Sequence, residues 1–216
     1  MDCRQRNHWL PPLDAAQPHA APPLLYAISA GSGPSGLDAL VAAAAAGVDM
    51  IQIREKHLTA RALFKFCRDL HAATHDTSAR LLLNGRWDIA VAAGLDGVHL
   101  PADGIPPATL RPLGPPGFII GQSCHSPAQA AAAVGADFCV LGPVFATPSK
   151  SGAPMGLAAL HAATATSAIP ILALGGITIA NAASCLGAGA AGLAGIRLFQ
   201  RDAAAVVAAL RRQRPL

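Results

Sequence analysis

The sequence predicts an α/β protein in which one domain, residues 24–216, forms a (β/α)8 barrel. Three observations lead to this prediction. Short apolar runs alternate with helix-like segments eight times along the chain. The runs are apolar throughout, as strands buried on both faces are. Polar residues follow the runs directly, at the strand ends where parallel α/β folds bind ligands. An open doubly wound sheet has the same alternation, because periodicity does not show whether a sheet closes.

The strands are predicted where four to six mostly apolar residues end at glycine, proline or polar residues. These runs are Leu24–Ser29, Val48–Ile53, Arg80–Leu83, Gly97–Leu100, Phe118–Gln122, Phe138–Leu141, Ile169–Leu174 and Ala191–Ile196. Residues 1–23 precede them and are rich in proline, alanine and polar residues without periodicity. We expect residues 1–23 to be a flexible arm.

The helices are predicted between the strands, where alanine is frequent or apolar residues recur at helical spacing. They are Leu37–Ala46, Leu58–Thr74, Trp87–Ala93, a short helix after Pro106, Ser126–Val134, Gly156–Thr166, Ile179–Leu186 and a last helix to Arg212. Asp202 is the expected N-cap of the last helix, because its carboxylate can accept hydrogen bonds from the first backbone amides.

Composition narrows the class of protein. With 52% hydrophobic and 13% charged residues among 216, the chain can bury a full core. It contains no run of about 18 apolar residues that would span a membrane and no signal-peptide pattern. Five scattered cysteines without a CxxC pair favour reduced thiols in the cytoplasm over disulfides or a zinc site. A net charge of +4 without a basic block argues against nucleic acid and is compatible with phosphorylated small molecules.

Two motifs at the predicted strand ends suit phosphate. Gly175 and Gly176 follow the seventh strand and precede a helix, where backbone amides favour an anion; a tight turn would also require glycine. Arg197, next to Ile196 after the last strand, can add a charge-assisted contact. After the second strand, Gln52, Arg54 and Lys56 can face one cavity and bind a polyanion. The alternative there is a rim ion pair with Glu55.

Two further strand ends carry hydroxyls, an ammonium group and an imidazole. Thr147, Ser149 and Lys150 suit an oxyanion. His125, two residues after Ser123, is the candidate general acid/base, because imidazole titrates near neutrality. His99 lies within a strand, and we interpret it as a packed core residue. Cys124 has no orienting partner in the sequence, which argues against a Cys–His nucleophile.

Six segments in this order resemble the thiamine-phosphate synthase/TenI superfamily. They are QIREK (52–56), LLLNGRWDIA (81–90), DGVHLP (96–101), IIGQSCHS (119–126), VLGPVFATPSK (140–150) and ILALGGIT (171–178). The resemblance implies a (β/α)8 barrel that acts on thiazole phosphate. It further implies pyrophosphate or pyrimidine contacts by Arg54, Lys56, Asn84, Thr147, Ser149 and Lys150. Ser123 would lie near the pyrimidine and Gly176 at the thiazole phosphate.

The departures from the synthase pattern concern Mg²⁺. The synthases have aspartates where this chain has Gly85 and Gly104, and Mg²⁺ is usually held through carboxylates plus phosphates. Asp103 or Glu55 could substitute. The Asn84-Gly85-Arg86 sequence is similar to TenI-like thiazole tautomerases, which use no metal, and His125 matches their catalytic histidine. The Thr147–Lys150 segment is closer to the synthases.

The sequence therefore predicts a metal-independent thiazole tautomerase that acts on thiazole phosphate carboxylate, with His125 catalytic and no cofactor. The expected substrate-binding residues are Gln52, Arg54, Lys56, Asn84, Ser123, Thr147, Ser149, Lys150, Gly175, Gly176, Ile196 and Arg197. The first alternative is a Mg²⁺-dependent thiamine-phosphate synthase that also binds pyrimidine diphosphate, and the second is a non-catalytic thiazole- or thiamine-phosphate-binding protein. A homodimer is compatible with the sequence.

Overall fold

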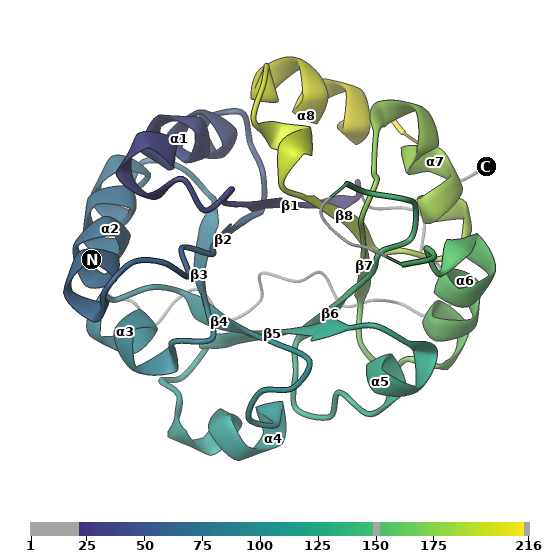
Figure 1. The fold of residues 1–216 in the computed structure, drawn as a ribbon, viewed down its shortest axis with the longest axis horizontal. Coiled ribbons are helices and arrows are strands. Elements are labelled where there is room, and N and C mark those ends of the chain that lie inside the picture. The colour runs from purple at the N-terminus through teal and green to yellow at the C-terminus, as the bar shows by residue number, and fades with distance from the viewer. Residues whose placement is uncertain (1–21, 149–151, 214–216) are drawn as a thin grey trace.

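The structure of the protein, a computed structural model, describes residues 22–148 and 152–213. Within these residues, eight parallel strands pair in chain order and β8 pairs with β1, so that the sheet closes into a ring (Figure 1). The strands are β1 (Leu24–Ile28), β2 (Met50–Ile53), β3 (Arg80–Asn84), β4 (Gly97–Leu100), β5 (Ile119–Cys124), β6 (Phe138–Leu141), β7 (Ile171–Leu174) and β8 (Gly192–Gly195). The predicted (β/α)8 barrel is confirmed, and the open sheet is wrong.

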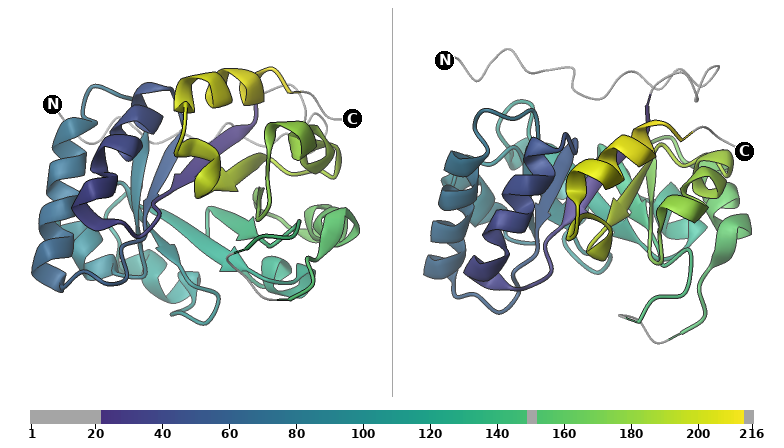
Figure 2. Two further views of the ribbon diagram at one scale, coloured as in Figure 1. Left: turned by 45° about the horizontal axis from the view of Figure 1, so that its top comes forward. Right: turned by 90° about the horizontal axis from the view of Figure 1, so that it is seen from above.

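The helices surround the ring on its outside (Figure 2). They are α1 (Leu37–Ala45), α2 (Ala60–Ala73), α3 (Trp87–Ala92), α4 (Pro107–Leu110), α5 (Pro127–Ala131), α6 (Gly156–Thr166), α7 (Ile179–Gly187) and α8 (Ala203–Arg211). Short 3-10 turns are η2 (Gly33–Gly36), η3 (Arg111–Leu113) and η4 (Arg197–Phe199). Asp202 caps α8 as predicted, since its Oδ1 accepts the Ala205 N–H at 3.2 Å. The residues predicted as an N-terminal arm lie outside the described part of the chain, except Pro22 and Pro23.

Several strand boundaries differ from the prediction by one or two residues, and the end of β5 matters most for the site. β5 extends to Cys124, so Ser123 belongs to the strand and only His125 lies beyond it. β7 begins at Ile171 rather than Ile169, because Pro170 has no N–H to donate to a neighbouring strand. The longer β5 places the Ser123 side chain on the fixed frame of the barrel instead of a loop.

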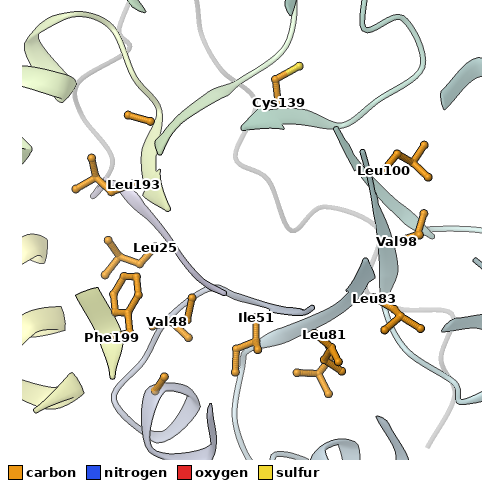
Figure 3. Packing of buried hydrophobic residues seen from close by; sticks show 14 of the residues in the cluster. Leu25, Val48, Ile51, Leu81, Leu83, Val98, Leu100, Cys139, Leu193 and Phe199 are labelled. Atoms are coloured by element: carbon orange, nitrogen blue, oxygen red, sulfur yellow. The ribbon is translucent and has the colours of Figure 1, made fainter. Parts of the chain in front are cut away.

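Apolar side chains fill both sides of the sheet, which explains the uniformly apolar strand sequences. Outward-facing residues such as Leu25, Ile51, Leu83 and Val98 pack beneath the helices (Figure 3). A second cluster fills the inside of the ring and consists of Tyr26, Ile28, Met50, Leu82, Ile119, Phe138, Val140, Leu172 and Ala194. No helix of the described chain is long and apolar enough to cross a membrane.

Three aspartates brace the barrel at the end opposite the predicted site. Each stands two residues after a glycine of positive φ and directly before an even-numbered strand, and each accepts a backbone N–H from the preceding strand. The bonds are Leu25 N–H to Asp49 Oδ2 (2.7 Å), Leu81 N–H to Asp96 Oδ2 (2.9 Å) and Ile120 N–H to Asp137 Oδ2 (2.7 Å). Arg211, Arg80 and Arg111 pair with them in turn. Before β8 this position is Ala191. We call the three elements Gly-x-Asp braces.

Candidate active site

The described site residues predicted from the sequence all lie at one end of the barrel, on or just after the carboxyl ends of the strands. They are Gln52, Arg54 and Lys56 at β2, Asn84 at β3, Ser123 and His125 at β5, Thr147 after β6, Gly175 and Gly176 after β7, and Ile196 and Arg197 after β8. Ser149 and Lys150 lie outside the described residues. Because parallel strands end on one rim, this placement follows from the closed topology.

At the end of β2, the chain is fixed by hydrogen bonds to the loop after β1. The Ser29 N–H donates to the Gln52 carbonyl at 2.9 Å, and the Arg54 N–H donates to Ser29 Oγ at 2.8 Å. Buried Glu55 accepts the Gly33 N–H at 2.7 Å. This carboxylate therefore holds the β1–α1 loop. Its Oε2 also lies 3.9 Å from Nδ1 of His57, an ion-pair contact at the rim of the kind that the sequence analysis gave as the alternative. Arg54 and Lys56 bring two positive charges to the rim.

At the end of β5, Ser123 and His125 each have a defined partner. Ser123 Oγ lies 3.0 Å from Nε2 of His99 on β4. His125 Nδ1 lies 2.9 Å from the Gly142 carbonyl oxygen. Since a carbonyl only accepts, Nδ1 carries the hydrogen in neutral His125, and Nε2 carries the lone pair. The exposed His125 imidazole is thereby oriented as a base through Nε2.

Cys124 lies between these residues but faces the helix layer. Its Sγ is 3.5 Å from Sγ of Cys139 on β6, and both side chains are buried. The hydrogen bond between the two thiols and burial raise the pKa of the Cys139 thiol. Cys124 thus pairs with Cys139 in the outer core, which agrees with the argument against a Cys–His nucleophile.

After β7, the two glycines are required by the backbone itself. Gly175 has φ +97° and Gly176 has φ +65°, the left-handed region that glycine adopts without strain. A Cβ on Gly176 would also lie 2.6 Å from the Ala146 carbonyl oxygen. The tight-turn explanation is therefore sufficient for both glycines, and phosphate binding here stays a prediction. The turn leads into α7, whose N-terminus is fixed by a capping box of Thr178 and Asn181.

Arg197 joins two loops of the rim. Its Nη2 donates to Thr147 Oγ1 at 3.1 Å, which links the segment after β8 to the loop after β6. The guanidinium is exposed, at the same rim as Gly176. Sequence reasoning placed Arg197 as a phosphate contact but could not foresee this bond, because the two residues are 50 positions apart.

The residues of this rim do not fit a carboxylate-held Mg²⁺ ion. Gly85 and Gly104 stand where the resemblance to the synthases implies aspartates, and the Glu55 carboxylate accepts the Gly33 N–H. Asp88 is bound by Arg86 at 2.6 Å, and this hydrogen bond lowers the pKa of Asp88. Asp103 is exposed. In the described residues, no three His, Cys, Asp or Glu side chains gather as a metal site.

Fold and rim together define a (β/α)8-barrel protein with cationic, hydroxyl and imidazole groups around one mouth. Comparison with known proteins identifies the family to which this barrel belongs. The chain belongs to the thiamine monophosphate synthase family, whose pattern matches residues 25–199, and it is an enzyme of thiamine biosynthesis.

Individual relatives agree with this family. The chain is 49% identical over 185 residues to a putative thiamine-phosphate synthase of Geobacter sulfurreducens, covering 82% of this chain and 87% of the relative. It is 46% identical over 168 residues to a thiamine-phosphate synthase of Methanoculleus marisnigri, covering 76% and 80%. Among solved structures, a thiamine phosphate pyrophosphorylase from Pyrococcus furiosus matches with a TM-score of 0.78 and 29% identity, covering 88% and 94%. These names favour the synthase over the tautomerase that the sequence analysis preferred.

One part of the site was missed by sequence reasoning. Tyr26, the chain's single tyrosine, lies inside the barrel with its hydroxyl 3.3 Å from Nδ1 of His99. The interpretation of His99 as a packed core residue holds, since its side chain is buried, yet its ring also touches Ser123. Gly121 within β5 was the available signal, because an isolated strand glycine often marks a close approach.

Proposed function

We propose that the protein is a thiamine-phosphate synthase, which joins a pyrimidine diphosphate to thiazole phosphate and releases pyrophosphate. The observation that carries this proposal is the similarity, over most of both chains, to proteins named thiamine-phosphate synthase. The tautomerase ranked first from the sequence becomes the second candidate.

The charges of the rim suit a diphosphate leaving group. Arg54 and Lys56 follow β2, and Arg197 follows β8, so that three cations share the rim. Cations placed where negative charge develops stabilise the departing group more than the bound reactant. Thr147, held by Arg197, adds a hydroxyl beside one of these cations. Lys150, a further cation that the sequence analysis named, lies outside the described residues.

The proposed reaction is a substitution at carbon. The bond between the pyrimidine methylene carbon and the diphosphate oxygen breaks, and pyrophosphate leaves with the electron pair. The thiazole nitrogen supplies the lone pair of the new C–N bond. The role of the protein is to align the two heterocycles and to offset the charge of pyrophosphate. Because the described rim lacks the carboxylates for Mg²⁺, the cations named above take on this second task.

A thiazole tautomerase is the second candidate, and His125 is the observation that favours it. Its Nδ1–H is held by the Gly142 carbonyl, which leaves Nε2 to take and return one proton. Such a proton transfer needs no metal, and the glycines at positions 85 and 104 would be without consequence.

One assay separates the candidates. The purified protein is given pyrimidine diphosphate with thiazole phosphate, or the thiazole phosphate carboxylate tautomer alone, each with Mg²⁺ or with EDTA. Formation of thiamine phosphate supports the synthase, and conversion of the tautomer in EDTA supports the tautomerase. Tight ligand binding with neither product would leave a binding protein and contradict the proposal.

The His125→Ala variant makes the assay sharper. A tautomerase should lose about 100-fold or more in rate, the scale of a general acid/base, whereas the proposed synthase chemistry transfers no proton at this position and should lose far less. The matched control is His75→Ala. His75 is an exposed histidine whose Nδ1 also lies 2.9 Å from a backbone carbonyl, that of Ala72, just after α2 and away from the rim. Its replacement should leave both reactions unchanged.

A further inference from the structure

A chain of polar side chains runs through the apolar interior of the barrel to the rim. The Tyr26 hydroxyl lies 3.3 Å from Nδ1 of His99, and Nε2 of His99 lies 3.0 Å from Ser123 Oγ. Gln52 forms a hydrogen bond with Tyr26 at the other end. Tyr26 is 0% and His99 1% exposed. Such a chain is unusual inside a core and is stable only when each member is satisfied.

Aromatic packing holds the rings of this chain in place. Tyr26, His99 and Phe138 pack as three rings with centroids 5.5 to 5.9 Å apart. Phe138 contributes shape but no hydrogen bond. The His99 ring is therefore fixed by packing on one side and by two hydroxyl groups, one at each nitrogen.

The two hydroxyl groups are unequal partners. Burial lowers the pKa of His99 to about 3, so that the ring is neutral near pH 7, with one N–H and one lone pair. A phenol is a stronger acid than an aliphatic alcohol and is the better donor, whereas the alcohol oxygen is the better acceptor. The favoured arrangement has Tyr26 donating to Nδ1 and His99 Nε2–H donating to Ser123 Oγ.

We propose that Tyr26 and His99 are positioning residues that direct the Ser123 hydroxyl hydrogen into the site. With its oxygen occupied by the His99 N–H, Ser123 acts as a hydrogen-bond donor toward the ligand. It then selects a group that accepts, such as the lone pair of a ring nitrogen in the pyrimidine substrate. The ligand part of this proposal rests on the proposed synthase function, whereas the direction of the hydrogen bonds from Tyr26 through His99 to Ser123 does not.

The direction of the hydrogen bonds between Tyr26, His99 and Ser123 can be measured without substrate. In protein labelled with ¹⁵N-histidine, long-range ¹H–¹⁵N NMR distinguishes a protonated ring nitrogen from one that carries a lone pair, and His99→Asn identifies the signals of His99. We expect the Nε2–H tautomer in the wild type. Ser123→Ala should keep it, because Tyr26 sets it, and Tyr26→Phe should abolish the strong preference. The Nδ1–H tautomer in the wild type would overturn the proposal.

Binding tests the consequence for the ligand. Calorimetry with pyrimidine diphosphate should show about fivefold weaker binding to Tyr26→Phe, the scale of one hydrogen bond, and unchanged binding of thiazole phosphate. Equal affinity of wild type and variant for pyrimidine diphosphate would overturn the positioning role. Phe138→Leu is the matched control, since it loosens the same ring cluster without removing a hydrogen bond, and it should retain the Nε2–H tautomer.

The experiments distinguish a failure of the proposed function from a failure of the positioning role of Tyr26 and His99. A wild type that binds no pyrimidine diphosphate would contradict the proposed function and the choice of ligand. The tautomer of His99 would still decide whether Tyr26 directs Ser123.

Discussion

Gly121 lies on the inner face of β5, opposite His99 in the register of β4 and β5. A Cβ at this position would lie 2.5 Å from Cζ of Phe138 and 2.7 Å from Nδ1 of His99. Neither ring can move freely, because both are buried. The absence of a side chain at Gly121 is thus what admits the His99 ring between Tyr26 and Ser123.

We expect Gly121→Ala to lower the free energy of unfolding by about 1–3 kcal/mol, the usual effect of overpacking a core. Urea denaturation measures this loss. The control is Gly36→Ala, where the new Cβ would meet only the side chain of Ser32, with its Cβ at 3.3 Å. Equal losses in the two variants would show that the space beside His99 is not required.

Gly85 stands at a position where the resemblance to the synthases implies a carboxylate that binds Mg²⁺. Gly85 has φ +71°, and a Cβ added at this position would meet no atom within 4 Å, apart from its own neighbours in the chain. Aspartate and asparagine tolerate this left-handed backbone better than most residues do. A carboxylate placed here would supply a ligand that Mg²⁺ prefers.

Gly85→Asp should therefore bind Mg²⁺ with pyrophosphate about tenfold more tightly than the wild type does, as measured by calorimetry. Gly85→Asn has the same shape without the charge and serves as the control. If both variants bind Mg²⁺ equally, the ion is not held at this position.

Among the elements, the Gly-x-Asp braces fix the start of three strands. Asp137 binds the Ile120 N–H of β5 and pairs with Arg111, whose guanidinium also donates to the Gly135 and Phe118 carbonyls. One carboxylate thus connects β5, β6 and the segment that contains η3. The Gly-x-Asp brace before β6 therefore fixes the position of β5 in the barrel, and β5 carries Ser123.

Asp137→Ala should lower the free energy of unfolding by about 1–3 kcal/mol, because it leaves the Ile120 N–H without its acceptor and removes the carboxylate partner of Arg111. Asp69→Ala, which removes an exposed pair with Lys65 on α2, should change it by less than about 0.5 kcal/mol. Chemical denaturation of both variants provides the comparison. A similar effect of the two would contradict a bracing role for Asp137.

The sequence predicted elements better than it predicted contacts. Alternation of apolar runs located the eight strands, since each is buried on both faces, and the glycine and polar residues after them located the rim. The extent of β5 was wrong by two residues, because Ser123 and Cys124 look like loop residues until the neighbouring β6 is in place. The role of Glu55 and the bond between Arg197 and Thr147 depend on folding distant loops together. Local sequence patterns do not show which distant loops come into contact in the folded protein.

At the scale of the whole molecule, closure of the barrel creates the polar chain. Tyr26 comes from β1, Gln52 from β2, His99 from β4 and Ser123 from β5. Neighbouring strands carry Tyr26 and Gln52, and likewise His99 and Ser123, but in an open sheet Tyr26 and His99 would share a face without meeting across the interior. The barrel also separates stability from substrate binding, since the Gly-x-Asp braces stabilise one end and the candidate substrate-binding residues lie at the other.

Buried His99 also couples the stability of the whole barrel to pH. The pKa of His99 is about 3 in the folded protein, because burial disfavours its charged form, and about 6.5 in an unfolded chain. Between these values the unfolded chain binds a proton that the folded barrel does not, so stability falls as the pH falls. This contribution is complete above pH 6.5 and is lost at up to about 1.4 kcal/mol per pH unit below it.

The partners of His99 are the neutral groups of Tyr26, Ser123 and Phe138, and none of them can compensate a charge on the ring. Urea denaturation between pH 7 and pH 4.5 should therefore show a steep loss of stability in the wild type. His99→Gln keeps a polar side chain that does not titrate, and its loss should be smaller by about 2–3 kcal/mol over that range. Parallel curves for the two proteins would mean that His99 can be protonated without opening the barrel.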